Sequence, residues 1–186
     1  MSPLIINGKT EKELIKAALG GDRKSQKDIF HLYASKMLAV SYRYAKDKAE
    51  AEDILQDAFI KVFTNLQDFE FKGSFEGWIR KIVVNTAIKF NLKRYHAYEE
   101  KKMEQIQEDW ENPEVFSNLA EIDLLHLIQE LPDGYKMVFN LYAIEGYSHK
   151  EIAEMCYIEE STSRSQLAKA RKILQQKVKG LLFLAV

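Results

Sequence analysis

Cysteine, proline and glycine are all scarce in this chain of 186 residues, which contains 1 Cys, 3 Pro and 8 Gly. The single cysteine, Cys156, excludes a disulfide within the chain and argues against a cysteine-based zinc site. The low content of glycine and proline disfavours folds built from many strands and turns, because helices are the elements that avoid both residues. The chain also lacks an apolar run of the ~18 residues that a membrane span needs.

We also expect no N-terminal signal peptide, since charged residues from Lys9 to Glu13 interrupt any apolar segment there. These absences predict a soluble, cytoplasmic protein that does not insert into a membrane. Histidines occur at four scattered positions, without the spacing of metal ligands: His31, His96, His126 and His149. Neither a glycine-rich phosphate loop nor a nucleophile motif is found. We therefore expect no enzyme activity, no catalytic residues, no metal and no cofactor.

What the sequence does contain is helical periodicity. Apolar residues recur at the spacing of one helix face in both halves, as in Leu55, Ala58, Phe59 and Val62 and in Leu124, Leu127, Ile128 and Leu131. The stretch from Tyr95 to about Ser117 is acidic and has no amphipathic stripe, which is typical of a linker. The pattern predicts an all-α fold with two small helical domains, 10–94 and 119–180, joined by an acidic linker over 95–118.

Charge is segregated along the chain although the totals nearly cancel, with 27 Lys and Arg against 28 Asp and Glu. Acidic residues dominate from Asp47 to Asp57 and again in the linker, whereas basic residues dominate from Lys72 to Arg94 and from Ser161 to Lys179. Solvated helix faces would explain any one block. Two basic blocks beside aromatic or hydroxyl residues instead favour two surfaces that bind nucleic acid.

The C-terminal half predicts a helix-turn-helix. Ser148 and Glu151 have the spacing of a capping box, which begins a short helix after the Glu145–Gly146 turn. A connection near Tyr157 leads to a longer helix over about 160–178, rich in residues that hydrogen-bond to bases and phosphates. Its candidate DNA-binding residues are Ser161, Thr162, Arg164, Ser165, Gln166, Lys169 and Arg171.

The helix that begins near Glu50 has a polar face opposite its apolar one. Asp53, Gln56, Asp57 and Ile60 fall on this face at spacings i, i+3, i+4 and i+7. An acidic stripe with one apolar residue suits docking against a basic partner helix. Acids placed to match the helix dipole are the alternative, which accounts for Glu50 better than for Asp57 because the dipole effect is confined to the first turn.

Three motifs carry a resemblance to a known family. AEDILQDAFIKVF (51–63) resembles the polymerase-binding helix of bacterial sigma factors, and SFEGWIRKIVVN (74–85) resembles their promoter-melting helix. The segment from Leu131 to Ala153 is similar to the sigma domain that reads the −35 element. With two domains and a short linker, the chain is identified as similar to the extracytoplasmic-function (ECF) group.

The resemblance implies a function and its partners. The expected function is promoter-specific transcription initiation, with core RNA polymerase and promoter DNA as partners and an anti-sigma factor as a further candidate. The acidic stripe would bind the clamp coiled coil of the largest polymerase subunit. Trp78 packs in the core or holds an unpaired base, and the sequence leaves both open. The residues implied for the −10 element are Lys72, Ser74, Trp78, Arg80, Lys81, Asn85, Lys89, Lys93 and Arg94.

Several positions depart from the pattern that is usual in the family. The family usually has glycine where Tyr157 and Ser161 stand, an apolar residue at Ser163 and often an acid at Lys89.

Two other classes of protein compete with the interpretation as a sigma factor. A stand-alone helix-turn-helix regulator would explain the C-terminal half but leaves the acidic stripe unexplained. A purely protein-binding helical module would have no affinity for nucleic acid.

Overall fold

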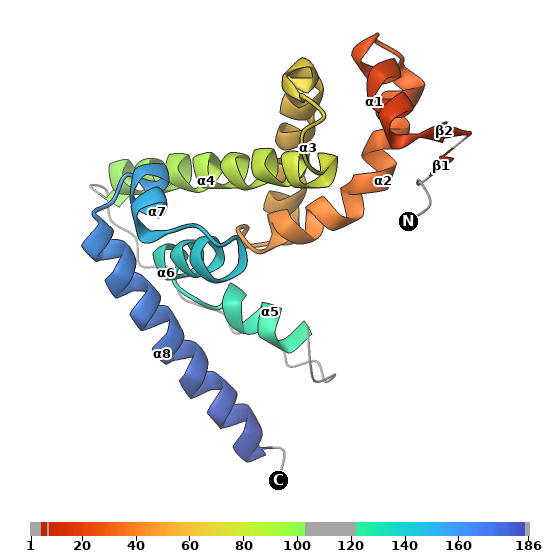
Figure 1. The fold of residues 1–186 in the computed structure, drawn as a ribbon. Coiled ribbons are helices and arrows are strands. Elements are labelled where there is room, and N and C mark those ends of the chain that lie inside the picture. Colours follow the sequence, from red (N-terminus) through yellow and green to blue (C-terminus); the bar gives the residue numbers. More distant parts are fainter. Residues whose placement is uncertain (1–4, 7, 103–121, 185–186) are drawn as a thin grey trace. The chain divides into compact units, whose positions relative to one another are not determined.

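The computed structural model of the protein describes residues 5–6, 8–102 and 122–184 (Figure 1). The expected all-α architecture is confirmed, with one addition. Two short strands, β1 (Ile5–Ile6) and β2 (Lys9–Thr10), form an antiparallel pair before the first helix. The chain divides into two compact units, Met1–Ala87 and Ile88–Val186.

The first unit contains α1 (Glu11–Leu19), α2 (Arg23–Tyr42), α3 (Lys48–Thr64), a short 3₁₀ turn η1 (Leu66–Asp68) and the start of α4 (Phe75–Lys102). The first three helices begin at side-chain caps. Thr10 and Glu13 form a capping box, while Asp22 and Asp47 accept from the backbone amides of Lys24 and Glu50. These caps satisfy amides that helix geometry leaves without a partner.

The core of the first unit lies where α1, α2, α3 and α4 present their apolar faces. Large side chains with less than 2% of their surface exposed include Leu14, Ile15, Ile29, Met37, Ile54, Phe75 and Ile79. Each such side chain contributes ~1.5–3 kcal/mol through removal from water. Because the buried face of α3 is continuous, its opposite face has to point to solvent.

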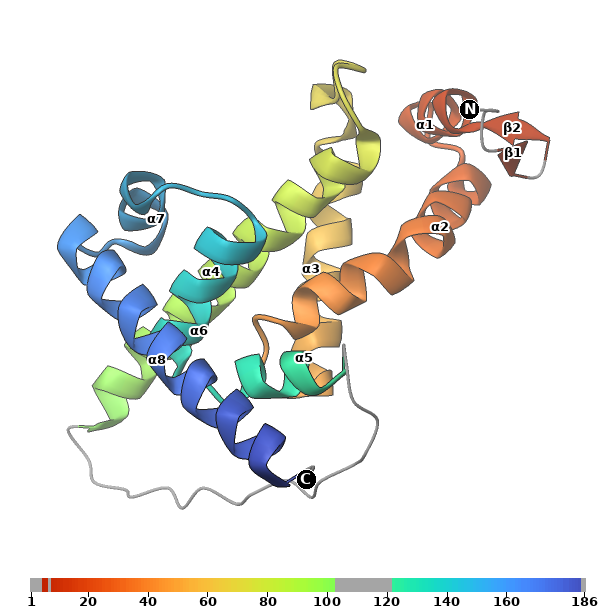
Figure 2. The ribbon, with the colours of Figure 1, turned by 60° about the horizontal axis from the view of Figure 1, so that its bottom comes forward.

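The second unit contains α5 (Ile122–Gln129), α6 (Asp133–Phe139), a π-helical turn η2 (Asn140–Ile144), α7 (His149–Cys156) and α8 (Glu160–Leu184). The helices α5, α6 and α7 all pack against α8 (Figure 2). Buried Ile128, Leu131, Ala170 and Leu174 form the centre of one core cluster. The expected helix-turn-helix is therefore present as α7, the turn at Tyr157 and α8.

One helix boundary differs from the expectation. Helix α4 continues to Lys102, so the first part of the expected linker is helical, and residues 103–118 lie outside the described part of the chain. The division between the two compact units falls after Ala87, within α4. Helix α6 ends at Phe139, where the chain widens into the π-turn η2.

Within the described residues, no helix combines the length and the hydropathy that crossing a membrane requires.

Candidate nucleic-acid and protein interfaces

The exposed face of α3 contains all four residues predicted to form a docking stripe. Asp53, Gln56, Asp57 and Ile60 are exposed, whereas Ala51, Ile54, Leu55, Ala58, Phe59 and Val62 are buried. Ile60, an apolar side chain among polar ones, has 63% of its surface exposed. The structure thus brings the four predicted residues together on one solvent-facing side.

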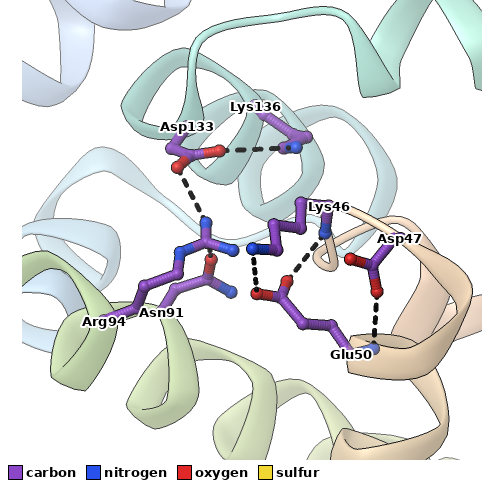
Figure 3. A network of polar contacts seen from close by, with 7 residues as sticks. All are labelled: Lys46, Asp47, Glu50, Asn91, Arg94, Asp133 and Lys136. Atoms are coloured by element: carbon purple, nitrogen blue, oxygen red, sulfur yellow. Dashed lines mark hydrogen bonds and ion pairs between the residues drawn. The ribbon is translucent and has the colours of Figure 1, made fainter. Parts of the chain in front are cut away.

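Acidic residues at the start of α3 are engaged within the chain, unlike those of the stripe. Glu50 accepts from the backbone amide of Lys46 at 2.8 Å, and its own amide donates to Asp47 Oδ1 at 2.8 Å (Figure 3). In the part of the chain that the structure describes, Asp53 and Asp57 form no ion pair. The helix dipole therefore explains the acids of the first turn, and the stripe residues remain available to a partner.

An aromatic cluster surrounds the loop before α4. The ring of Phe69 lies 5.1 Å from Phe71, 4.9 Å from Phe75 and 5.5 Å from Trp78, between ring centroids. Trp78 stacks on Phe75 with 13° between the planes, and it is half-buried. Trp78 therefore packs against the core with one part of its ring and faces solvent with another. The two roles considered for it are compatible.

Four of the predicted −10 residues lie along one side of the first part of α4, beginning at the residue before it. Ser74 Oγ accepts from the amide of Gly77 at 3.3 Å, which helps to begin the helix. Trp78, Lys81 and Asn85 follow Ser74 at helical spacing, so the four lie along one side of α4. Lys81 is exposed and Asn85 is half-buried. A lysine, an amide and a partly exposed indole side by side suit an unstacked strand.

The remaining residues of this predicted set are arranged differently. Exposed Lys72 pairs with Glu70 at 2.6 Å in the loop, and half-buried Arg80 also has an interaction within the chain. Lys89 and Lys93 are exposed on the second part of α4, which belongs to the second unit. Half-buried Arg94 donates to Asn91 Oδ1 at 2.8 Å and to Asp133 at 2.7 Å (Figure 3).

The carboxylate of Asp133 holds a buried lysine as well as Arg94. Lys136 has 4% of its surface exposed, and its ammonium lies 3.4 Å from Asp133 and 3.4 Å from the carbonyl oxygen of Gln129. A buried ammonium requires such partners because its hydration is lost. Arg94 is thus part of a structural network at the start of α6, in addition to any contact it makes with DNA.

The helix-turn-helix begins and turns through local geometry. Ser148 and Glu151 form the predicted capping box, and Gly146 has the expected positive φ, at +81°. The carboxyl pKa of Glu151 is lowered, first by the side-chain and then by the backbone hydrogen bond of Ser148. The turn places Tyr157 in the left-handed region, at φ +55°, with 85% of its surface exposed. This is the position at which the family usually has glycine, and the reason is the backbone conformation.

The polar residues of α8 surround its buried side. Ser163, Leu167, Ala170 and Leu174 are buried, while Ser161, Arg164, Ser165, Lys169 and Arg171 are exposed and Thr162 and Gln166 are half-buried. Most of the predicted DNA-binding residues have a partner within the chain. Arg164 pairs with Glu160, Ser165 donates to the carbonyl oxygen of Thr162 at 3.0 Å, and Gln166 packs beside Gly134.

A hydrogen bond joins the two helices of the motif at Ser163. Its hydroxyl, fully buried, lies 2.9 Å from Nδ1 of His149, the first residue of α7. The imidazole satisfies this hydroxyl, which allows a serine at a buried position of α8. The pKa of His149 is lowered, first by burial and then by the positive charge of Arg164. A neutral imidazole is therefore the form that this junction favours.

Cys156 lies in the turn region and is nearly buried, with 8% of its surface exposed. Burial raises the pKa of its thiol to about 11, which suits a packing residue and not a nucleophile. Among the described residues, no group of three or more His, Cys, Asp or Glu side chains is placed to hold a metal ion.

Sequence reasoning missed the aromatic partners of the candidate interfaces. Phe71, exposed and at φ +58°, has Lys12 over its ring at 5.8 Å. Tyr142 stacks on His149 and also lies beneath Arg171, while Tyr135 lies beneath Lys169. A left-handed φ and a cation over a distant ring leave no periodic signal in the sequence. Only Gly73, two residues after Phe71, indicates an unusual backbone in that loop.

Two protein families match separate segments of the chain. The family described as Sigma-70 region 2 matches residues 29–96, and the family described as Sigma-70, region 4 matches residues 121–174. These segments contain the docking stripe of α3, most of α4 and the helix-turn-helix. Helix α1 and the β1–β2 pair lie outside both matches.

Whole-length relatives agree with the family matches. The chain is similar to the ECF RNA polymerase sigma-E factor of Haemophilus influenzae, with 26% identity over 190 residues that cover 93% of this chain and 97% of that protein. It is also similar to the ECF RNA polymerase sigma factor SigW of Bacillus subtilis, with 29% identity and coverage of 91% and 97%. A solved structure, the sigma factor RpoE of Bartonella quintana in complex with the anti-sigma factor NepR, shares the fold with a TM-score of 0.52, 22% identity and coverage of 82% and 96%.

Proposed function

Because the chain is a sigma factor of the extracytoplasmic-function group, which directs transcription initiation, we propose how its two units divide this work. The first unit binds core RNA polymerase and holds the −10 element during promoter melting. The second unit reads the −35 element. Members of this family are sigma factors and not enzymes, so the chemistry of RNA synthesis belongs to the polymerase. We accordingly place the protein in the cytoplasm, where the polymerase is found.

The observation that carries the polymerase assignment is the exposed stripe of α3. Asp53 and Asp57 face solvent without an ion pair among the described residues, and Ile60 beside them exposes 63% of its surface. Two free carboxylates give electrostatic attraction to a basic helix, and the isoleucine adds apolar area beside them. The partner we propose is the basic coiled coil of the polymerase clamp.

Promoter melting is assigned to the start of α4. The partly exposed ring of Trp78, with Lys81 and Asn85 on the same side of the helix, offers stacking, charge and hydrogen bonding to one unpaired strand. Extruding a base costs a few kcal/mol, which contacts of this kind have to offset. Lys72, Ser74 and Arg80 extend the proposed −10 surface within the first unit, and we propose that Lys89, Lys93 and Arg94 continue it along the second part of the same helix, beyond the first unit.

The −35 element is assigned to α8. Arg164 lies in its second turn, where a guanidinium can pair with a guanine edge, and Ser161, Thr162, Ser165 and Gln166 lie nearby. Lys169 and Arg171 follow further along, where we propose phosphate contacts. Regulation by an anti-sigma factor is part of the proposal, because the similar Bartonella quintana protein was solved bound to one.

Run-off transcription with core RNA polymerase and genomic fragments tests the function. Transcripts that begin at defined sites only when this chain is added support the sigma assignment. Sequence-specific binding to duplex DNA by the chain alone, with no effect on transcripts, would support the stand-alone regulator instead.

The melting assignment needs a separate measurement on the promoters recovered in that way. We expect Trp78→Ala to leave the holoenzyme bound to duplex promoter but to abolish permanganate reactivity of unpaired thymines. Trp78→Phe keeps a ring against Phe69 and Phe75 and serves as the control for packing. Normal permanganate reactivity in folded Trp78→Ala would remove Trp78 from the melting machinery.

A further inference from the structure

Two of the cations proposed to contact DNA phosphates lie over tyrosine rings. Arg171 lies 5.6 Å from the ring centroid of Tyr142, measured from its guanidinium carbon, and the Lys169 ammonium lies 5.9 Å from that of Tyr135. Both distances are within the ~6 Å at which a cation is attracted to the face of an aromatic ring. The two rings come from different elements, since Tyr135 is in α6 and Tyr142 is in the π-turn η2.

Tyr142 is itself fixed by a neighbour. Its ring stacks on that of His149, with 4.5 Å between centroids and 23° between planes. Nδ1 of His149 lies 2.9 Å from the buried hydroxyl of Ser163, which anchors the imidazole to α8. A continuous series of contacts therefore runs from Ser163 through His149 and Tyr142 to Arg171, and both of its ends lie on α8.

We propose that Tyr142 is a positioning residue for promoter binding: its ring, held by His149, orients the Arg171 guanidinium for a phosphate of the −35 region. This inference rests on the proposed function, in which α8 lies against DNA. In the proposed complex, Tyr142 contacts neither a base nor a phosphate. The residue acts through Arg171 alone.

The physical advantage lies in which groups of Arg171 remain free. A guanidinium has five N–H donors, and the attraction between Arg171 and the face of the Tyr142 ring involves its charge and no carboxylate acceptor. Arg164 differs, because its guanidinium donates to Glu160, and a phosphate has to compete with that carboxylate. Tyr142 thus limits the conformations of Arg171 and leaves its hydrogen-bonding capacity for DNA.

The test is a double-mutant cycle on the holoenzyme, reconstituted from core polymerase and the full chain. The probe is a promoter duplex recovered by run-off transcription, and affinity is measured at several salt concentrations. The variants are Arg171→Gln, Tyr142→Leu and the two combined. Tyr142→Phe is the conservative rescue. Tyr135→Leu is the matched control, since it makes the same kind of change beneath Lys169.

We expect Arg171→Gln to reduce the salt slope by roughly one, the loss of one phosphate contact. Tyr142→Leu should weaken binding about two- to fivefold, the range for an exposed cation–π pair, and reduce the slope by a smaller amount. In the Arg171→Gln background, Tyr142→Leu should have no further effect. Tyr142→Phe should bind like the unmodified protein, whereas the effects of Tyr135→Leu and Arg171→Gln should add.

The outcomes separate this inference from the proposed function. An unchanged salt slope in Arg171→Gln would remove Arg171 from the DNA interface, and the proposal on Tyr142 would fall with that assignment. A reduced slope in Arg171→Gln together with full additivity of Tyr142→Leu would overturn the inference alone. If Tyr142→Leu loses helical content, Tyr142→Met takes its place in the cycle, because an unbranched side chain repacks more readily.

Discussion

The two candidate interfaces differ in how their charged groups are held before any partner arrives. On α3, Asp53 and Asp57 extend into solvent without an ion pair among the described residues. On α8, Arg164 is paired with Glu160, while Lys169 and Arg171 lie over tyrosine rings. A surface of free carboxylates attracts a partner by charge and adapts to it. A surface of oriented cations loses less conformational freedom on binding, which suits contacts that fix the position of α8 on the DNA backbone.

The largest effect is expected from reversing the two free charges of α3. We expect Asp53→Lys plus Asp57→Lys to abolish co-elution with core polymerase, because two attractive charges at the contact become repulsive. Helical content should stay unchanged, since both residues are exposed and the core face of α3 is intact. Size-exclusion chromatography and circular dichroism measure the two properties.

The matched control is Asp68→Lys plus Glu70→Lys, which changes net charge by the same amount on exposed residues of the same unit. This variant should still co-elute with the polymerase. Loss of binding in both pairs would show that net charge matters and the stripe does not.

A smaller effect is expected from lowering the pH, which protonates His149 and weakens its contacts within the second unit. The pKa of His149 is lowered in the folded protein, so the unfolded chain, with a pKa of ~6.5, takes up the proton first. The contribution of His149 to stability is therefore present above about pH 6.5 and is lost as pH falls through the folded pKa. Hydrogen exchange of the α7 and α8 amides, corrected for intrinsic rates, should show weaker protection at pH 5.5 than at pH 7.5.

His149→Gln should reduce this pH dependence, because glutamine does not titrate. His126→Gln, at an exposed histidine of α5, should retain it. Equal pH dependence in both variants would show that His149 is not its source.

The smallest effect is expected from a substitution in the turn between α7 and α8, measured as the stability of the second unit. Tyr157 has φ +55° and loses little contact when shortened, since 85% of its surface is exposed. Tyr157→Gly should stabilise the second unit by up to ~1 kcal/mol, because a left-handed conformation is costly for every residue with a Cβ, while the flexibility of glycine in the unfolded chain offsets part of the gain. Urea denaturation measures it. Tyr157→Ala retains the Cβ and should give no such gain.

Local signals in the sequence predicted the elements of the fold well. The capping box of Ser148 and Glu151, the positive φ of Gly146 and the exposed face of Asp53, Gln56, Asp57 and Ile60 all follow from spacing along one helix or turn. Such features depend on neighbours within about one or two turns, which sequence periodicity reports directly.

Contacts between elements were not predictable in the same way. Nothing in the spacing of Tyr142, His149 and Arg171 indicates that the three side chains meet, because the meeting depends on how η2, α7 and α8 pack. The continuation of α4 to Lys102 was missed because an acidic, apolar-poor segment has no amphipathic stripe. The burial of Ser163 was missed because its hydroxyl is satisfied by a histidine fourteen positions away.

The π-turn η2 determines which residues of its helix can face α7. A π-turn contains one residue more than an α-turn, and Asn140–Ile144 therefore lies out of register with the helix that precedes it. Removal of one residue from this segment would restore the α-helical register and rotate one side of the helix by roughly 100° relative to the other. Tyr142 would then lose its place beside His149. An alignment of relatives that places a gap within 140–144 would accordingly mark proteins that orient this arginine by other means, or that lack it.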